Sequence, residues 1–383
     1  MKSKTIIVLL MAVFLVLNTG FAAAQNFSID AEIGLLFDYN SGQIIFSQNA
    51  DQPWIPASLV KVMTMYVALD RIAAENIPLD KTFKVSEKAW QMGGSQMFLE
   101  VGEEVTIEDL LNGIAVVSGN DACITIAEGF AGTEELYVRW MNEKAEQLGL
   151  DLHFVDVHGL SEDNRITADD FALLVYNYIK DYPNALQYHS RLSFGYKPRS
   201  SANPIVQSNR NGLLRTYEGA DGLKTGHLSE AGYNLVATAV QDNRRLIAIV
   251  LGAESELKRE QEAAKALNYG FRSFENISAD DLLTVQDARI YKGRKNYLPI
   301  STGGAQITIN RGFQGDLKAK VEISVLEAPI LIGEQVGELL IYTQAGLLNK
   351  VPLVAVETVE RGNWFSVLID TFILFFSKLF SKG

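Results

Sequence analysis

Two residues near the start of the chain have types and a spacing that suit nucleophilic catalysis. Ser58 and Lys61 follow Pro56-Ala57 and lead into the apolar segment 62–69. Residues three apart lie on one face of a helix, so the amine of Lys61 can reach the hydroxyl proton of Ser58. Burial would lower the pKa of this amine, and a helix N-terminus favours a developing alkoxide. The alternative is an N-cap serine with a solvated lysine, because Ser-x-x-Lys alone is common.

Two further polar motifs follow in the chain. Ser118-Gly119-Asn120 comes first, and Lys224-Thr225-Gly226-His227 stands just before a predicted hairpin at 233–251. Taken singly, the first also fits a capping box for a helix over 122–129, and the second is an ordinary turn-to-strand sequence. Chance seldom produces all three motifs in this order. We therefore predict an acyl-transfer site in which the 224–227 strand faces Ser58.

The elements that must position these motifs are predicted from hydrophobic patterning. Two hairpins, 33–47 and 233–251, enclose turn sequences rich in Asn, Asp and Gly. Capping boxes at Thr106 and Thr167 predict two helix starts between them. Hairpins distant in sequence with helices between them are typical of an α+β domain, so we expect an antiparallel sheet flanked by helices.

The hydrophobic pattern of the sequence changes at about residue 275. Short runs of alternating hydrophobicity, separated by glycine-containing turns, cover 305–309, 317–325, 337–342 and 351–356. They predict a small all-β sandwich. No residue there suggests chemistry, and the prediction is a spacer domain, with ligand binding as the alternative.

The three motifs together resemble those of the active-site-serine penicillin-recognising enzymes. The sequence looks most like the low-molecular-mass D-alanyl-D-alanine carboxypeptidases of the penicillin-binding protein 5 type. The resemblance rests on five blocks, which are 57–64, 117–123, 209–214, 221–227 and 231–236. That family also carries a C-terminal β domain and an amphipathic membrane helix, so the resemblance covers nearly the whole mature chain.

The resemblance implies a role for each matching residue. Ser58 would be the nucleophile that the penultimate D-alanine acylates, Lys61 its base, and Ser118 the relay of the proton to the leaving D-alanine. A second set would bind the substrate, and it comprises Asn120, Arg210, Lys224, Thr225, Gly226 and His227. Serine acyl transfer needs no metal or organic cofactor, and none is expected.

Within this substrate-binding set, Arg210 and Thr225 would receive the terminal carboxylate of the peptide. Lys224 would supply positive potential and a hydrogen bond beside Ser118. The backbone N–H groups of Ser58 and His227 would form the oxyanion hole, as acyl transfer requires.

The last motif ends at His227 and is followed by Leu228. The ring of His227 also fits a partly exposed strand residue with no catalytic ionisation, so its backbone matters more than its ring. Leu228 stands where the nearest members of the family more often carry threonine, which affects the rim of the site only.

The function implied is removal of the terminal D-alanine from peptidoglycan stem pentapeptides, with β-lactams as covalent inhibitors. A β-lactamase is the nearest alternative, but no Glu occurs between Glu146 and Glu162 to activate the deacylating water. We therefore expect a slowly hydrolysed penicilloyl-enzyme. The motifs are also compatible with endopeptidase or transpeptidase activity and with a non-catalytic peptidoglycan-binding scaffold.

Composition excludes several classes of protein. The 383 residues are 48% hydrophobic with only 9 prolines, which excludes a disordered chain. A net charge of −12 argues against nucleic-acid binding. One cysteine, Cys123, cannot form an internal disulfide, and the four histidines form no zinc motif.

Both ends of the chain predict targeting to a membrane. Residues 1–24 combine two lysines, an apolar run over 6–17 and Ala22-Ala23-Ala24, typical of a cleaved secretory signal rather than of a membrane span. Residues 364–380 predict an amphipathic helix whose aromatic face would lie in the inner-membrane surface and whose solvated polar face would include Asp370. A spanning helix or a buried terminal helix would also fit this segment. We thus expect a signal peptide (1–24), a catalytic domain (25–273), a β-sandwich (274–359), an anchor (360–383) and a periplasmic location.

Overall fold

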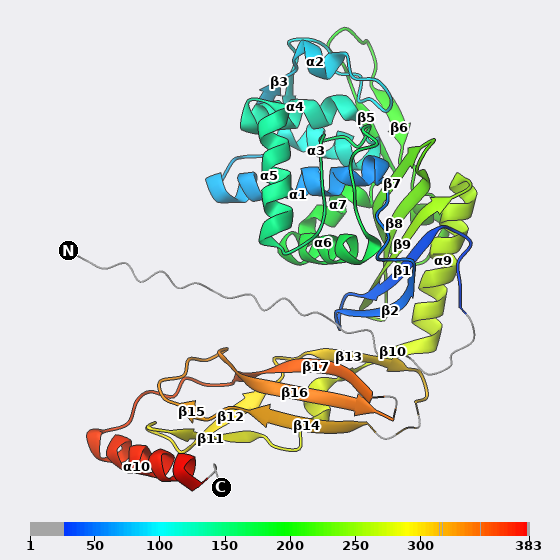
Figure 1. Ribbon diagram of the computed structural model, residues 1–383. Helices are drawn as coiled ribbons and strands as arrows, with labels where there is room; N and C mark the ends of the chain where they lie inside the picture. The colour runs from blue at the N-terminus through cyan, green and yellow to red at the C-terminus, as the bar shows by residue number, and fades with distance from the viewer. Residues whose placement is uncertain (1–26, 314, 316, 345, 381–383) are drawn as a thin grey trace, which may run out of the picture. The chain divides into compact units, whose positions relative to one another are not determined.

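The computed structural model describes residues 27–313, 315, 317–344 and 346–380, and Figure 1 shows its course. The predicted signal peptide, 1–24, lies outside the described residues. The described chain divides into two compact units, 27–273 and 274–380. The three chemical motifs all belong to the first, which we call the catalytic unit.

The catalytic unit is built on a five-stranded sheet in the order β2-β1-β9-β8-β7, in which all neighbours are antiparallel. Its strands are β1 (Ile33–Asp38), β2 (Gln43–Gln48), β7 (Ala220–Leu228), β8 (Gly232–Gln241) and β9 (Arg244–Ala253). Both predicted hairpins are confirmed, and β1 pairs with β9 from the far end of the domain sequence. The predicted fold class is therefore correct, and β7 is an edge strand.

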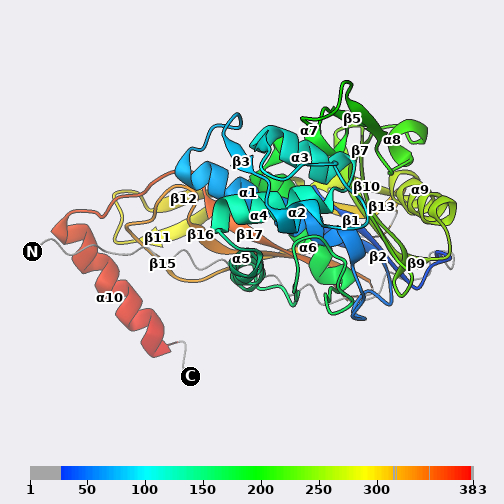
Figure 2. The same ribbon diagram turned by 90° about the horizontal axis from the view of Figure 1, so that it is seen from above.

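Helices cover both faces of this sheet (Figures 1 and 2). Helix α9 (Glu256–Ser273) packs on β8 and β9 from one side. The other side faces the main hydrophobic core, to which α1 (Lys61–Glu75), α3 (Ile107–Val116), α4 (Asn120–Ala131), α5 (Glu134–Gln147) and α6 (Ala168–Asp181) contribute. Shorter elements complete the unit: η1 (Ala57–Val60), β3 (Thr82–Lys84), α2 (Glu87–Trp90), β4 (Glu104–Thr106), η2 (Pro183–Ala185), α7 (Leu186–His189), β5 (Ser193–Tyr196), β6 (Ile205–Ser208) and α8 (Leu213–Thr216).

The two predicted helix starts are confirmed, because their side chains supply the missing acceptors. The hydroxyl of Thr106 accepts the N–H of Asp109 at 3.1 Å at the start of α3. The hydroxyl of Thr167 accepts the N–H of Asp170 at 3.2 Å at the start of α6. The N–H groups of the first turn of a helix have no partner inside it, and such caps satisfy one of them.

The capping box considered at Ser118 does not form. Helix α4 begins at Asn120, and its N-cap residue Gly119 makes no side-chain cap. Asp121 instead accepts the backbone N–H groups of Met97 and Leu99. Its carboxylate also accepts the N–H of Ala122 in the first turn, so it joins the start of α4 to the neighbouring chain.

The second unit is an all-β domain with one C-terminal helix, as predicted. A six-stranded sheet runs in the order β14-β16-β17-β12-β11-β15, and β10 pairs with β13. The strands are β10 (Phe274–Ser278), β11 (Asp287–Tyr291), β12 (Tyr297–Ser301), β13 (Gln306–Asn310), β14 (Lys318–Ile323), β15 (Leu326–Glu327), β16 (Gln335–Thr343) and β17 (Gly346–Ala355), with η3 (Ala279–Leu282) after β10. Their buried aliphatic residues form a separate core.

Helix α10 (Trp364–Phe380) lies at the β11 and β15 end of this domain in both views (Figures 1 and 2). The sequence predicts Asp370 on its solvated face, but Asp370 is buried against β11. Its carboxylate accepts the N–H of Lys292 and lies 3.7 Å from Arg289. The aromatic side chains of the helix remain exposed. None of the helices within the described ranges combines the length and apolarity needed to cross a bilayer.

Candidate active site

The predicted nucleophile and base are in contact, although they do not share one α-helix. Ser58 lies in the 3₁₀ turn η1, and Lys61 is the first residue of α1. The Lys61 Nζ is 2.9 Å from the Ser58 Oγ. The Lys61 side chain is fully buried, which excludes the alternative of a solvated lysine.

Burial decides the charge of this amine. Removal from water lowers the pKa of Lys61, because the charged form loses its hydration. Cys123 and Asp156 oppose this shift, whereas the positive charge of Arg210 adds to it. A lowered pKa increases the fraction of neutral amine at physiological pH, and only the neutral amine accepts a proton.

The second motif brings two side chains to the same point. Asn120 Oδ1 is 2.8 Å from the Lys61 Nζ, and its Nδ2 donates to the Gly93 carbonyl, which fixes the orientation of the amide. Ser118 is buried with a φ of 61°, a left-handed conformation that functional sites retain at an energetic cost. Its Oγ has no hydrogen-bond partner within the described part of the chain, so it is available to a reacting group.

The third motif lies on edge strand β7, which runs against η1. A Cβ at Gly226 would lie 2.7 Å from the Pro56 carbonyl oxygen and 3.2 Å from the Ser58 nitrogen. Only a glycine lets the strand approach the nucleophile this closely. The predicted juxtaposition of the 224–227 strand with Ser58 is thereby found in the structure.

The remaining residues of β7 differ in exposure. Lys224 is buried, and its Nζ donates to the Thr225 carbonyl at 2.9 Å rather than to Ser118. Desolvation lowers the pKa of Lys224, and the neighbouring Lys61 and Arg210 add to this shift. His227 is exposed, and its ring stacks on Tyr233 with a centroid separation of 4.1 Å. This position fits the interpretation of His227 as an exposed strand residue whose ring takes no part in proton transfer.

A cavity of about 340 Å³ opens over this group of residues. Ser58, Ser118, Asn120, Arg210, Thr225, Gly226 and His227 all line it, together with Gly94, Ser95, Leu160, Leu228, Glu256 and Arg259. Lys61 and Lys224 lie beneath it and are not part of the lining. The structure thus gathers the nine predicted site residues in and directly under one cavity.

Sequence reasoning missed Arg259. This α9 residue lines the cavity and is 1% exposed, and its Nε has no hydrogen-bond partner among the described residues. Its Nη2 donates to the Arg210 carbonyl at 3.2 Å. The charged sequence of α9 resembles any solvated helix, so the only available signal was a buried position on the apolar stripe of that helix.

Sequence reasoning also missed the segment 155–164. The carbonyl of His158 accepts a hydrogen bond from the Lys61 Nζ at 2.5 Å. A backbone acceptor carries no side-chain signature, so residue types alone could not reveal this contact.

A buried Ser–Lys pair beside the edge strand of a helix-flanked antiparallel sheet defines a serine enzyme of the acyl-transfer class. Comparison with known proteins narrows this class. A family model described as D-alanyl-D-alanine carboxypeptidase matches residues 19–255, and one described as penicillin-binding protein 5, C-terminal domain, matches 271–361. The chain belongs to the D-alanyl-D-alanine carboxypeptidase family.

Individual relatives agree with this assignment. The D-alanyl-D-alanine carboxypeptidase DacC of Escherichia coli is 37% identical, over 96% of this chain and 95% of that protein. Penicillin-binding protein 5 from Haemophilus influenzae superposes with a TM-score of 0.78 at 34% identity, covering 88% of this chain and 100% of that one. Penicillin-binding protein D2 from Listeria monocytogenes, solved in an ampicillin-bound form, gives 0.58 at 27% identity over 65% of this chain and 100% of that one.

Proposed function

We propose that this D-alanyl-D-alanine carboxypeptidase removes the terminal D-alanine of peptidoglycan stem pentapeptides through an acyl-enzyme on Ser58. The observation that carries the proposal is the 2.9 Å contact between the Ser58 Oγ and a fully buried Lys61 amine. The amine takes the hydroxyl proton as the oxygen attacks the penultimate D-alanine carbonyl. The backbone N–H groups of Ser58 and His227 receive the developing oxyanion.

The proton must then reach the departing D-alanine. Ser118 has a buried hydroxyl without a partner in the described chain, next to an Asn120 amide that contacts Lys61. Lys61 returns the proton through the Ser118 hydroxyl to the leaving amine, while Asn120 holds the substrate amide. Lys224 is buried beside Thr225 and, in its protonated form, adds positive potential at this point.

Positive charge on the cavity wall accounts for recognition of a free carboxylate. Arg210 and Thr225 line the cavity, and the buried Arg259 adds a second guanidinium. Guanidinium groups bind carboxylates with planar, charge-assisted hydrogen bonds. These residues receive the terminal carboxylate, which makes the enzyme a carboxypeptidase rather than an enzyme for internal peptide bonds.

The test is mass spectrometry of a muramyl-type pentapeptide incubated with the protein. The wild type should remove one alanine, and Ser58→Ala should remove none. Ser47→Ala, which changes an exposed serine of β2, serves as the matched control and should behave as the wild type. A cross-linked product would instead show a transpeptidase, and an unchanged peptide would contradict the proposal.

The same site should react with β-lactams, as the ampicillin-bound form of the Listeria protein suggests. The ring carbonyl of penicillin would acylate Ser58. The predicted absence of a deacylating glutamate favours a long-lived adduct. Intact-protein mass spectrometry should show one penicilloyl group that persists for many minutes, whereas rapid multiple turnover of penicillin would identify a β-lactamase.

We further propose that the protein is exported and held at the periplasmic face of the inner membrane by residues 364–380. The support is an exposed row of aromatic and aliphatic side chains on α10, including Trp364, Phe365, Phe372 and Phe375. Such a face suits the interface of a lipid bilayer. Sedimentation with phospholipid vesicles should retain the full mature chain and lose a variant that ends at residue 363, and equal sedimentation would contradict the anchor.

A further inference from the structure

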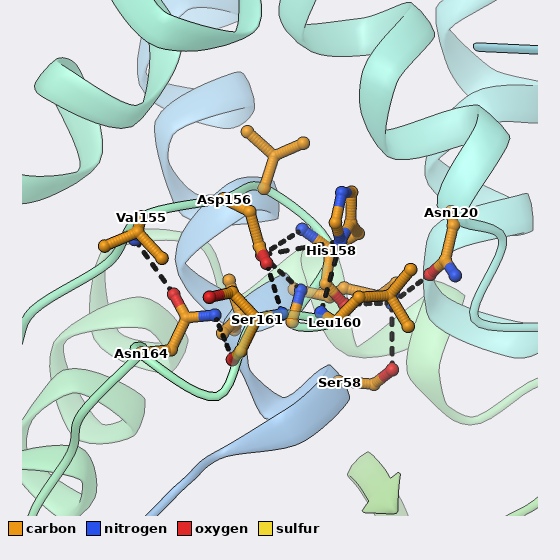
Figure 3. A network of polar contacts seen from close by, with 12 residues as sticks. Ser58, Asn120, Val155, Asp156, His158, Leu160, Ser161 and Asn164 are labelled. Carbon is orange, nitrogen blue, oxygen red and sulfur yellow. Dashed lines mark hydrogen bonds and ion pairs between the residues drawn. The ribbon is translucent and has the colours of Figure 1, made fainter. Parts of the chain in front are cut away.

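The segment 155–164 lies beside the nucleophile Ser58, as Figure 3 shows. It is tied to α1 at two consecutive backbone carbonyls. The Lys61 Nζ donates to the His158 carbonyl at 2.5 Å, and the Thr64 hydroxyl donates to the Val157 carbonyl at 2.7 Å. Asn164 closes the segment on itself, because its amide accepts from the Val155 N–H and donates to the Ser161 carbonyl.

The contact with His158 determines where the lone pair of the Lys61 amine points. A neutral amine has two hydrogens and one lone pair. Two of its three neighbours, Asn120 Oδ1 at 2.8 Å and the His158 carbonyl at 2.5 Å, are acceptors only. Both hydrogens are therefore used, and the lone pair is left facing the Ser58 hydroxyl at 2.9 Å. Without the His158 carbonyl, the amine could rotate and direct a hydrogen at Ser58.

A single buried carboxylate gives the segment its shape. Asp156 accepts the N–H of His158 at 3.0 Å, the N–H of Gly159, and the N–H of Ser161 at 2.7 Å. Figure 3 shows its carboxylate turned into the bend of the segment. Gly159 has a φ of +83°, and a Cβ there would lie 2.0 Å from the Ala57 carbonyl oxygen. The bend is thus pressed against the backbone that precedes the nucleophile.

The ring of His158 is held in one form by its surroundings. Its Nδ1 accepts the N–H of Leu160 at 3.2 Å and so carries no proton. Glu134 lies 3.6 Å from the Nε2, and desolvation lowers the pKa of the ring. The imidazole is neutral and turned away from Lys61, so the segment acts on the amine through its backbone.

We propose that Asp156 is a positioning residue, which holds the His158 carbonyl on the Lys61 amine so that the lone pair of that amine faces Ser58. This inference rests on the proposed function. In the step it supports, the Ser58 O–H bond breaks and its proton binds the Lys61 nitrogen. The Ser58 oxygen forms the bond to the substrate carbonyl carbon, while the π bond of that carbonyl breaks and its electron pair moves onto the carbonyl oxygen. The resulting ammonium keeps three acceptors, which are Ser58 Oγ, Asn120 Oδ1 and the His158 carbonyl.

The test measures the rate at which a fluorescent penicillin acylates the full mature chain, for Asp156→Ala and Asp156→Asn. The rate is measured across pH and is divided by the number of active sites that the penicillin can label. Misplacing a reacting group by about 1 Å costs on the order of 100-fold, so Asp156→Ala should acylate about 10- to 100-fold more slowly. Asparagine keeps an acceptor for the N–H groups of His158 and Gly159 and loses only the one for Ser161. Asp156→Asn should therefore recover part of the rate.

The pH profile separates this role from a merely structural one. The charges that act most strongly on Lys61 are those of Asp156, Asp121, Cys123 and Arg210, and Lys224 and His158 also interact with it electrostatically when protonated. Loss of the Asp156 charge lowers the pKa of Lys61 further, so the rising limb of the rate should move to lower pH in both variants. A structural role would reduce only the melting temperature and the number of titratable sites.

Asp163→Asn removes an exposed carboxylate from the same segment and should match the wild type. A wild-type rate per site in Asp156→Ala would overturn the proposal. If that variant does not fold, a wild-type rate and profile in Asp156→Asn would overturn it equally. Failure of the wild type itself to form an acyl-enzyme would contradict the proposed function, not the positioning role.

Discussion

At the scale of single residues, the site depends on two lysine amines that are buried where a positive charge is energetically costly. Lys61 and Lys224 are both buried under the cavity, and desolvation lowers the pKa of each. Their mutual repulsion acts in the same direction for Lys224. Burial of two amines does not stabilise the fold. It does supply a lysine that can be neutral near physiological pH, which a catalytic base requires.

The first prediction concerns pH. The neutral Lys61 amine is the active form and its pKa lies below the ordinary value of about 10.4, so the rate of Ser58 acylation should rise with pH and level off below the pH at which an ordinary lysine titrates. Stopped-flow acylation by penicillin between about pH 5 and pH 11 measures this limb. A rate that continues to rise through pH 10 would show an unshifted lysine.

The second prediction concerns Gly226. A methyl group there would lie 2.7 Å from the Pro56 carbonyl oxygen, so Gly226→Ala should push β7 away from η1 and displace the oxyanion donors. Loss of one such donor lowers the rate about 10² to 10³-fold, and penicillin acylation of the variant should fall by a similar factor. Gly195→Ala in β5 meets the exposed Val206 side chain at 3.2 Å and Pro204 at 3.8 Å, and it serves as the control. Equal acylation in both variants would contradict the close approach.

At the scale of elements, the C-terminal helix has two different faces. Asp370 and Leu374 are buried against the β domain, whereas Phe372 and Phe376 are exposed. A carboxylate on a helix of this kind is well placed when it accepts a backbone N–H, and Asp370 does so from Lys292. The helix is therefore held through the side that carries Asp370 and Leu374, which leaves the aromatic side chains exposed.

The third prediction follows from this contact. Asp370→Ala should free α10 from β11, because the N–H of Lys292 and the guanidinium of Arg289 lose their common partner. Hydrogen exchange of the α10 amides should become faster, while sedimentation with vesicles should persist because the aromatic face is intact. Thr371→Ala, on the exposed side, is the control. Unchanged exchange in Asp370→Ala would show that apolar packing alone holds the helix.

At the scale of the whole molecule, the active site and the proposed membrane anchor belong to different units. Every residue of the site lies between 57 and 259, inside the catalytic unit 27–273. The second unit has its own core. A core closed within each unit implies that each can fold without the other.

The fourth prediction tests this independence. A chain limited to residues 27–273 should fold and be acylated by penicillin at a rate within about twofold of the full mature protein, because the site residues and the core that supports them lie within this range. Acylation kinetics and thermal unfolding measure both properties. A large loss of rate with an unchanged melting temperature would reveal a contribution of the second unit to the site.

The sequence alone determined the elements and the chemistry. Alternating and helical hydrophobicity predicted both hairpins and the caps at Thr106 and Thr167, because these signals are local. The Ser-x-x-Lys spacing placed an amine beside a hydroxyl for the same reason. The nine candidate residues came from three motifs and one resemblance, and they gather at one cavity.

Only the tertiary structure decided what surrounds that pair. Four features surround it: the burial of Lys61, the approach of Gly226 to η1, the buried Arg259 and the carbonyl of His158. The segments that create them are between about 60 and 200 residues away from the pair in sequence, and packing of the core fixes their positions. Asp370 shows the same limit in reverse. Its place on the helical wheel indicated solvent. The N–H of Lys292, just after β11, holds it inside, and no side-chain pattern encodes such a backbone contact.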